Sequence, residues 1–120
     1  MTSLSPSKSV IDALEAASGS GPVVMVNLLK FKRGGGSKAY ARYAEAFEVL
    51  LKRAGGRFLY TGRVAEAVVG EEAWDAIALV EYPSRRVFAE VIRSADYAAI
   101  AAFREDGLER TLLYATDPRS

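Results

Sequence analysis

Residues 21–32 read Gly21-Pro22-Val23-Val24-Met25-Val26-Asn27-Leu28-Leu29-Lys30-Phe31-Lys32. The run is rich in β-branched and other apolar residues and lies between a Gly-Pro pair and the glycines at 34–36, which predicts a β-strand. Alternate residues of a strand point to opposite faces, and here both sets are apolar. We therefore expect this strand to be covered on both sides, with Asn27 as a single polar residue in the middle of one face.

The rest of the chain alternates between helical and strand periodicity. The expected elements are a helix within residues 1–20, a helix at 37–54, strands at 57–65 and 74–82, a helix that begins at 84, restarts near 94–96 and stops at 107, and a strand at 108–116. With right-handed crossovers, this β-α-β-β-α-β order predicts a four-stranded antiparallel sheet with both crossover helices on one face. The predicted fold is α+β and ferredoxin-like, with an extra N-terminal helix.

Local signals place the element boundaries. Ser5 followed by Pro6 predicts the start of the N-terminal helix, and Ser37 predicts the N-cap of the next one. Gly62 indicates a bulge in the second strand, and Trp74 is expected to open the third. Because 120 residues suit one core, we divide the chain into an N-terminal helix and linker, residues 1–20, and one ferredoxin-like domain, residues 21–120.

The composition limits the available chemistry. The chain has no cysteine and no histidine, so it lacks thiolate ligands and the commonest metal ligand and general base. We therefore expect no metal and no cofactor. Sixteen basic residues oppose 15 acidic ones, and a net charge of +1 argues against a nucleic-acid partner. No apolar run approaches the length of a membrane span or a signal peptide, so we expect a cytoplasmic protein that does not bind membranes.

The two crossover helices cover only one face of the expected sheet. Four strands about 4.8 Å apart and about 20 Å long leave an opposite face of roughly 400 Å² in plan. That is near the largest apolar patch that a soluble monomer exposes. The strand at 74–82 is apolar on both sides, with Ile77 and Leu79 opposite Ala78 and Val80. We therefore expect a homodimer in which two sheets stack by their open faces.

Asn27 is the first candidate for a ligand contact. Its amide lies among apolar neighbours, and leaving it without hydrogen bonds would cost about 1–3 kcal/mol. Two interpretations stay open. The amide bonds to neighbouring backbone or a partner subunit, or it provides a polar position in a ligand pocket.

Glu81 is the candidate catalytic residue. It precedes Pro83 at the end of its strand and shares a face with Ile77 and Leu79. A carboxylate among apolar neighbours can act as a proton-transfer base. The alternative is an ion pair at the rim of the sheet, for which the candidate partners are Arg57, Arg63, Arg85 and Arg104.

Tyr60 and Arg104 complete the candidate ligand-binding set with Asn27 and Glu81. Aromatic rings with a polar tip suit small organic ligands, and Tyr40, Tyr43 and Trp74 are further rings of this kind. Tyr40 and Tyr43 lie on the apolar side of their helix, which favours core packing for both. Arg104 lies near a helix end, where it can face an anionic substrate or form a salt bridge.

Several short motifs are spread along the chain. They are residues 21–32, Gly55-Gly56-Arg57 before Tyr60-Thr61-Gly62, Trp74-Asp75, Glu81-Tyr82-Pro83-Ser84-Arg85, Tyr97, and Arg104 with Gly107-Leu108. Together they resemble the family called domain of unknown function 1330, from about residue 21 to the end. The resemblance implies the dimeric α/β-barrel superfamily. That superfamily includes cofactor-free monooxygenases, lactone isomerases, haem-dependent enzymes and proteins of no known activity, so the fold alone does not choose a function.

Three functional hypotheses follow. The first is a homodimer that binds a small, largely apolar molecule, either inside the barrel or between sheet and helices, with Asn27 orienting it. The second is a cofactor-free enzyme of the isomerase or monooxygenase type, with Glu81 or a tyrosine as proton acceptor. The third is a structural or regulatory dimer with a filled interior.

Overall fold

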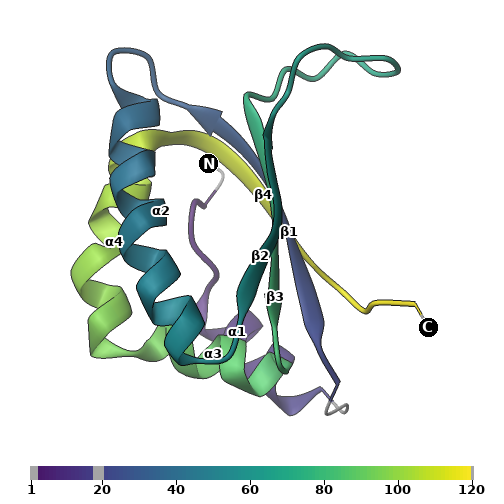
Figure 1. Ribbon diagram of the computed structural model, residues 1–120, viewed down its shortest axis with the longest axis vertical. Helices are drawn as coiled ribbons and strands as arrows, with labels where there is room; N and C mark the ends of the chain where they lie inside the picture. Colours follow the sequence, from purple (N-terminus) through teal and green to yellow (C-terminus); the bar gives the residue numbers. More distant parts are fainter. Residues whose placement is uncertain (1–2, 18–20, 120) are drawn as a thin grey trace.

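Four antiparallel strands form the sheet, in the order β2-β3-β1-β4. The computed structural model describes residues 3–17 and 21–119. Its elements are α1 (Lys8–Ala16), β1 (Val23–Phe31), α2 (Gly36–Arg53), β2 (Arg57–Arg63), β3 (Ala76–Tyr82), α3 (Arg85–Arg93), α4 (Ala95–Gly107) and β4 (Leu108–Thr116). The order of elements and the sheet confirm the predicted α+β ferredoxin-like fold with an extra N-terminal helix (Figure 1).

β1 lies at the centre of this sheet, between β3 and β4. Asn27, in the middle of β1, is opposite Ala78 of β3 and Leu113 of β4. Every second residue of β1 from Val23 to Leu29 is buried, and the residues between them are half-buried. Because α2, α3 and α4 all stand on one side of the sheet, no helix of residues 3–17 and 21–119 covers the other face (Figure 1).

Aromatic and aliphatic side chains fill the space between sheet and helices. The buried residues of this core are Val23, Met25, Tyr43, Phe47, Leu51, Ala78, Val80, Tyr82, Phe88 and Val91. On α2 the spacing of four residues between Tyr43, Phe47 and Leu51 places all three on one side of the helix. Full burial of each large apolar side chain contributes about 1.5–3 kcal/mol to stability.

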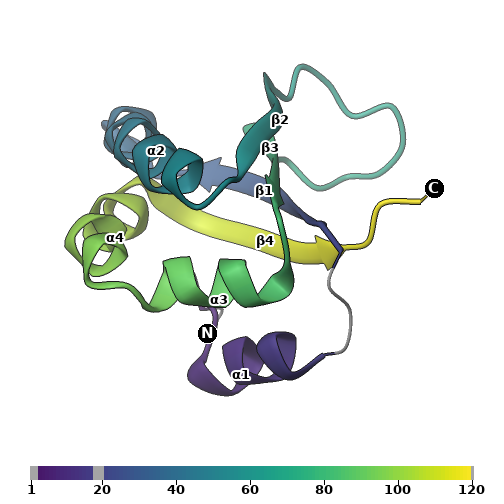
Figure 2. The same cartoon turned by 60° about the horizontal axis from the view of Figure 1, so that its bottom comes forward.

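α1 packs against α3, on the side of the molecule where β4 is the edge strand (Figure 2). Ile11 of α1 is buried there. Arg93 of α3 forms ion pairs with Asp12 and Glu15 of α1, so apolar and charged contacts together hold the N-terminal helix on the domain.

Two predicted helix starts were wrong. α1 has Ser7 as its N-cap, not Ser5, because the Ser7 hydroxyl accepts a hydrogen bond from the Val10 N–H at 3.2 Å. α2 begins at Gly36 after Gly35, whose left-handed conformation turns the chain into the helix, so Ser37 lies inside it. The part of the predicted linker at residues 18–20 lies outside the described residues.

Two predictions about the strands also fail. The register of β2 shifts between Phe58 and Tyr60, so the bulge lies there and not at Gly62. The Tyr60 ring lies over Gly62, where a Cβ would come within 2.7 Å of a ring carbon, so a larger residue at this position would require the exposed Tyr60 ring to move. β3 begins at Ala76, two residues after Trp74, whose ring packs against the Arg110 guanidinium at 4.4 Å.

A close contact between two glycines joins the start of α2 to the end of α4. A Cβ on Gly36 would lie 2.7 Å from the Gly107 carbonyl oxygen, and a Cβ on Gly107 would lie 2.6 Å from that of Gly36. The Gly107 carbonyl also accepts a hydrogen bond from the Lys32 N–H at 2.9 Å. Since Tyr40 and Arg104 each lie one helical turn from this contact, the contact brings them together.

We predict that Gly36→Ala destabilises the protein by about 1–3 kcal/mol, because the added methyl group forces the two backbones apart. Urea denaturation measures this change. Gly21→Ala is the control, since nothing lies within 4 Å of a Cβ at Gly21. Helix propensity alone favours alanine over glycine by up to about 1 kcal/mol. A Gly36→Ala protein as stable as the wild type, or more stable, would therefore contradict the close contact.

Candidate functional site

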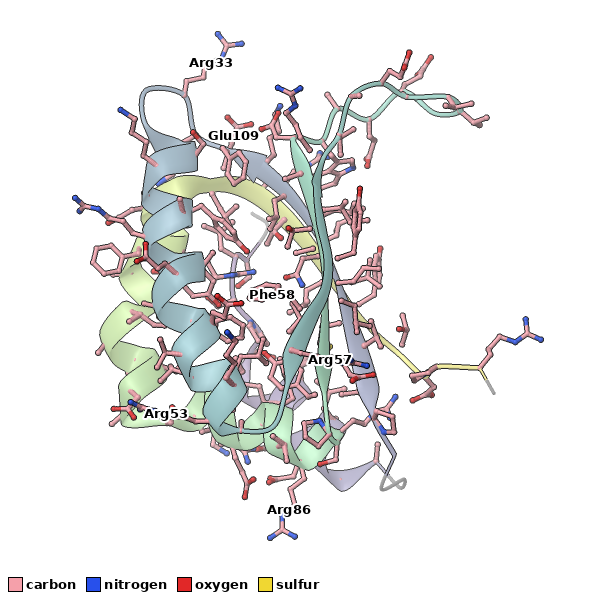
Figure 3. All side chains as sticks on the ribbon, in the orientation of Figure 1. Arg33, Arg53, Arg57, Phe58, Arg86 and Glu109 are labelled. Atoms are coloured by element: carbon pink, nitrogen blue, oxygen red, sulfur yellow. The ribbon has the colours of Figure 1, made fainter. Side chains whose placement is uncertain are left out.

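A cavity of about 40 Å³ lies between the sheet and the helices. Its wall consists of Pro6, Met25, Asn27, Tyr40, Tyr43, Ala44, Phe47, Phe58, Val80, Tyr82, Phe88, Ile92, Tyr97, Arg104 and Leu113. In Figure 3, the labelled Phe58 of β2 lies in this interlayer space, where its ring packs edge-on against Phe47 of α2. The wall combines apolar and aromatic side chains with a few polar tips, which is the composition typical of small-molecule pockets.

Tyrosines from two helices form the most polar part of the aromatic wall. Tyr40 and Tyr43 lie one turn apart on α2, with ring centroids 5.3 Å apart. The Tyr43 hydroxyl lies 3.1 Å from that of Tyr97 on α4, and either oxygen can donate. The Tyr43 and Tyr97 rings meet edge to face. Phenol groups that can donate hydrogen bonds therefore converge on one side of the cavity.

Asn27 presents its amide to the same cavity from the sheet. Its Nδ2 donates to the Ala78 carbonyl at 3.3 Å and more weakly to the Met25 carbonyl at 3.5 Å. Within residues 3–17 and 21–119, its Oδ1 accepts no hydrogen bond. Asn27 therefore bonds to neighbouring backbone, which was the first of the two interpretations from the sequence. It also lines the cavity, as the second interpretation requires.

Arg104 is the positive charge of the cavity and is only 5% exposed. Its Nη1 donates to the backbone carbonyl of Leu4, in the segment before α1. No carboxylate of the described chain pairs with it, so a salt bridge within the chain, one of the two roles expected from the sequence, is absent there.

Burial raises the pKa of three phenols in the cavity wall, which are neutral at physiological pH. It raises the pKa of Tyr40 to about 12, although the charge of Arg104 opposes the rise. Burial also raises the pKa of Tyr43 and of Tyr82 well above the ordinary value of 10.0. These side chains can donate hydrogen bonds to a ligand, but they are poor proton acceptors.

The structure separates the four candidate residues into two pairs. Asn27 and Arg104 line the cavity. Tyr60 and Glu81 belong to the opposite face of the sheet, where Tyr60 is opposite Leu79 and is 55% exposed. Glu81 forms an ion pair with Arg57, with 3.1 Å between Oε1 and Nε, which is the alternative considered for it from the sequence.

Tyr82 and Tyr97 are cavity residues that the sequence analysis named only as parts of motifs and not as candidates for the site. Tyr97 and Arg104 are seven residues apart, two helical turns, and so share one face of α4. The spacing was visible in the sequence. The sequence did not show which face of α4 turns toward the sheet, because this helix is only weakly amphipathic.

Two further findings concern other site types. The described residues contain no group of three or more Asp or Glu side chains placed to hold a metal ion. Among the helices of residues 3–17 and 21–119, none is long and apolar enough to cross a membrane.

Comparison with solved structures places the chain in a class. The protein of unknown function RPA0582 from Rhodopseudomonas palustris is 28% identical, with a TM-score of 0.90 over 98% of this chain and 97% of that one. A dabb-family protein with a ferredoxin-like fold from Mesorhizobium loti is 14% identical, with a TM-score of 0.61 over 83% and 99%. A putative antibiotic biosynthesis monooxygenase from Bacteriodes thetaiotaomicron is 15% identical, with a TM-score of 0.61 over 82% and 90%. The class is therefore the ferredoxin-like α/β proteins.

A family model identifies the family of this chain within that class. The model of the family described as "Domain of unknown function (DUF1330)" matches residues 35–117, and this chain belongs to that family. The match begins after β1, so the resemblance noted at residues 21–32 lies outside it. No curated protein matches the chain.

We predict that Tyr40→Phe makes stability less sensitive to alkaline pH. Below pH 10 the phenol is protonated in both states. Between pH 10 and about 12 only the unfolded chain releases the proton, so rising pH favours unfolding. Removing the phenol should reduce the loss of unfolding free energy over this window by up to about 1.4 kcal/mol per pH unit. Urea denaturation at several pH values measures the slope, and equal slopes in both proteins would contradict the burial of Tyr40.

Proposed function

We propose that this protein binds a small, largely apolar molecule in the cavity between sheet and helices. The observation that supports this most is the pairing of aromatic walls with two polar groups whose hydrogen-bonding capacity the described residues use only in part: the Asn27 amide oxygen, which accepts no bond there, and the Arg104 guanidinium, which donates to the Leu4 carbonyl alone. A polar group buried in an apolar wall is costly unless it is hydrogen-bonded, and a bound molecule would supply the missing partners.

The cavity of about 40 Å³ holds little more than a water molecule, so the ligand must extend into adjoining space. A space of about 340 Å³ shares Pro6, Met25, Phe88 and Leu113 with the cavity. A groove of about 430 Å³ between α2 and the β2 side of the sheet shares Tyr40, Ala44 and Phe58. Both lie next to the cavity, and together they have the size of an ordinary ligand site.

Binding is favoured over the cofactor-free enzyme hypothesis. The fold is similar to that of a putative monooxygenase, which is the observation in favour of the enzyme hypothesis. However, the carboxylate proposed as proton acceptor, Glu81, is paired with Arg57 on the far side of the sheet. The raised pKa values of Tyr40, Tyr43 and Tyr82 suit donation better than proton abstraction.

We predict that Ala44→Phe abolishes ligand binding by filling the cavity from α2. In a thermal-shift screen of a small-metabolite library, at least one compound should stabilise the wild type. At 100 times its dissociation constant the gain is about 2.7 kcal/mol. Ala41→Phe is the matched control, because it is the same change on the exposed side of α2. A wild type that no compound stabilises, or a hit that stabilises Ala44→Phe equally, would contradict the proposed site.

We also propose that the working form is a homodimer joined through the open face of the sheet. The half-buried or exposed residues of that face include Val24, Val26, Leu28, Ile77, Leu79, Leu112, Tyr114 and Tyr60. The loop between β2 and β3 and the C-terminal tail project to this same side (Figures 1 and 2). Val68 and Val69 of the loop are more than 90% exposed, at 91% and 94%.

A second copy fits this face by area and by chemistry. The sheet face offers roughly 400 Å² in plan, and the loop and tail enlarge it toward the roughly 800 Å² per partner of a standard interface. Arg110 at one end of the face has a buried Nε with no acceptor among the described residues. A cytoplasmic location remains part of the proposal, to be tested by cell fractionation.

We predict that Leu79→Glu converts the dimer to a monomer, because it places a carboxylate in the middle of the proposed interface. Light scattering after size-exclusion chromatography should give twice the 13.0 kDa chain mass for the wild type and the single mass for the variant. Val49→Glu, on a half-exposed position of α2, is the control and should stay dimeric. A wild type of 13.0 kDa at micromolar concentration would contradict the dimer.

A further inference from the structure

We propose that the ligand of the cavity is a small organic monocarboxylate with an apolar body, and that its carboxylate pairs with Arg104. This inference rests on the proposed function and adds the chemical class of the ligand. It is carried by one juxtaposition: a buried guanidinium in a wall of phenols and apolar side chains that contains no carboxylate.

A buried charge normally has a partner of opposite sign. Among the described residues, 15 line the cavity; Arg104 is the one cation in this set, and none of the set is an aspartate or glutamate. Its nearest acidic neighbour in sequence, Glu105, is exposed and bonds at 3.4 Å to the Ser5 hydroxyl. The cavity therefore carries a net positive charge in a region of low dielectric constant, where an anion is bound most strongly.

The donors of Arg104 are only partly used. Of its five N–H groups, the described chain engages Nη1, with the neutral carbonyl of Leu4. A carboxylate can take a planar guanidinium through two parallel hydrogen bonds, and charge-assisted bonds are about twice as strong as neutral ones. The Arg104 guanidinium therefore binds a ligand carboxylate more strongly than it binds the Leu4 carbonyl. The phenols of Tyr40 and Tyr97 on the same wall are further donors for the carboxylate oxygens.

The adjoining spaces indicate where the apolar body lies. None of the described residues in the wall of the space of about 340 Å³ is charged, and the wall includes Val10, Leu14, Leu112 and Ala115. The groove of about 430 Å³ on the other side has Glu45 and Glu48 at its wall, which repel an anion. The body of the carboxylate therefore extends toward α1 and β4, past the segment that contains Leu4 and Pro6.

Isothermal titration at pH 7 with benzoate and its neutral isostere benzamide tests the inference. Benzoate should bind the wild type at least about ten-fold more tightly than benzamide, as expected for a charge-assisted pair. Arg104→Met should weaken benzoate binding by a similar factor and leave benzamide binding within about three-fold. Arg86→Met is the control, because Arg86 points into solvent from α3 (Figure 3). In the wild type, the Arg104 Nε–H resonance should shift with benzoate and less with benzamide.

The outcomes separate this inference from the function on which it rests. If benzamide binds as tightly as benzoate, or if Arg104→Met leaves benzoate binding unchanged, the carboxylate inference is overturned and the cavity remains a site for neutral molecules. If neither probe binds the wild type, the carboxylate inference is overturned. The library screen with Ala44→Phe then tests separately whether the cavity binds any small molecule. Benzamide binding to Arg104→Met also shows that the variant folds with its cavity intact.

Discussion

The structure depends on a central strand that is apolar on both of its faces. β1 pairs with β3 and β4 along its length, and its side chains alternate between a buried set against the helices and a half-buried set on the open face. The helices α2, α3 and α4 all stand on one side of the sheet (Figure 1). The helix side therefore becomes the core, and the other side becomes the surface on which a second copy is proposed to pack.

Within the core, polar groups are concentrated where α2, α4 and β1 meet. The contact of Gly36 with Gly107 brings the ends of the two helices close enough for Tyr40 and Arg104 to share a wall. Asn27 reaches the same space from the sheet. A core built only for stability would fill this region with aliphatic side chains, because a buried guanidinium without a carboxylate lowers stability. The arrangement therefore supports the proposal of a ligand in this space.

Periodicity in the sequence was enough to predict the order of elements, the sheet and the two apolar faces of β1. It also marked Asn27, since an amide in an apolar strand is unusual, and Arg104, for which a position near a helix end left an anionic substrate or a salt bridge as the two expected roles. It could not show that Glu81 and Asn27 lie on opposite faces of the sheet. That depends on the pairing register, in which Glu81 is opposite Val24 and Asn27 opposite Ala78. The partner of Arg104, a carbonyl in the segment before α1, was equally invisible because it is a hundred residues away in sequence.

The central claim is that the space between sheet and helices is a site organised by Asn27 and Arg104. A high-resolution crystal structure of the protein as purified tests it most directly. The account predicts electron density for a bound molecule, or for ordered water in its place, in contact with both the Asn27 amide oxygen and the Arg104 guanidinium. A cavity closed by the protein's own side chains, with Arg104 paired to a carboxylate of its own chain, would contradict it.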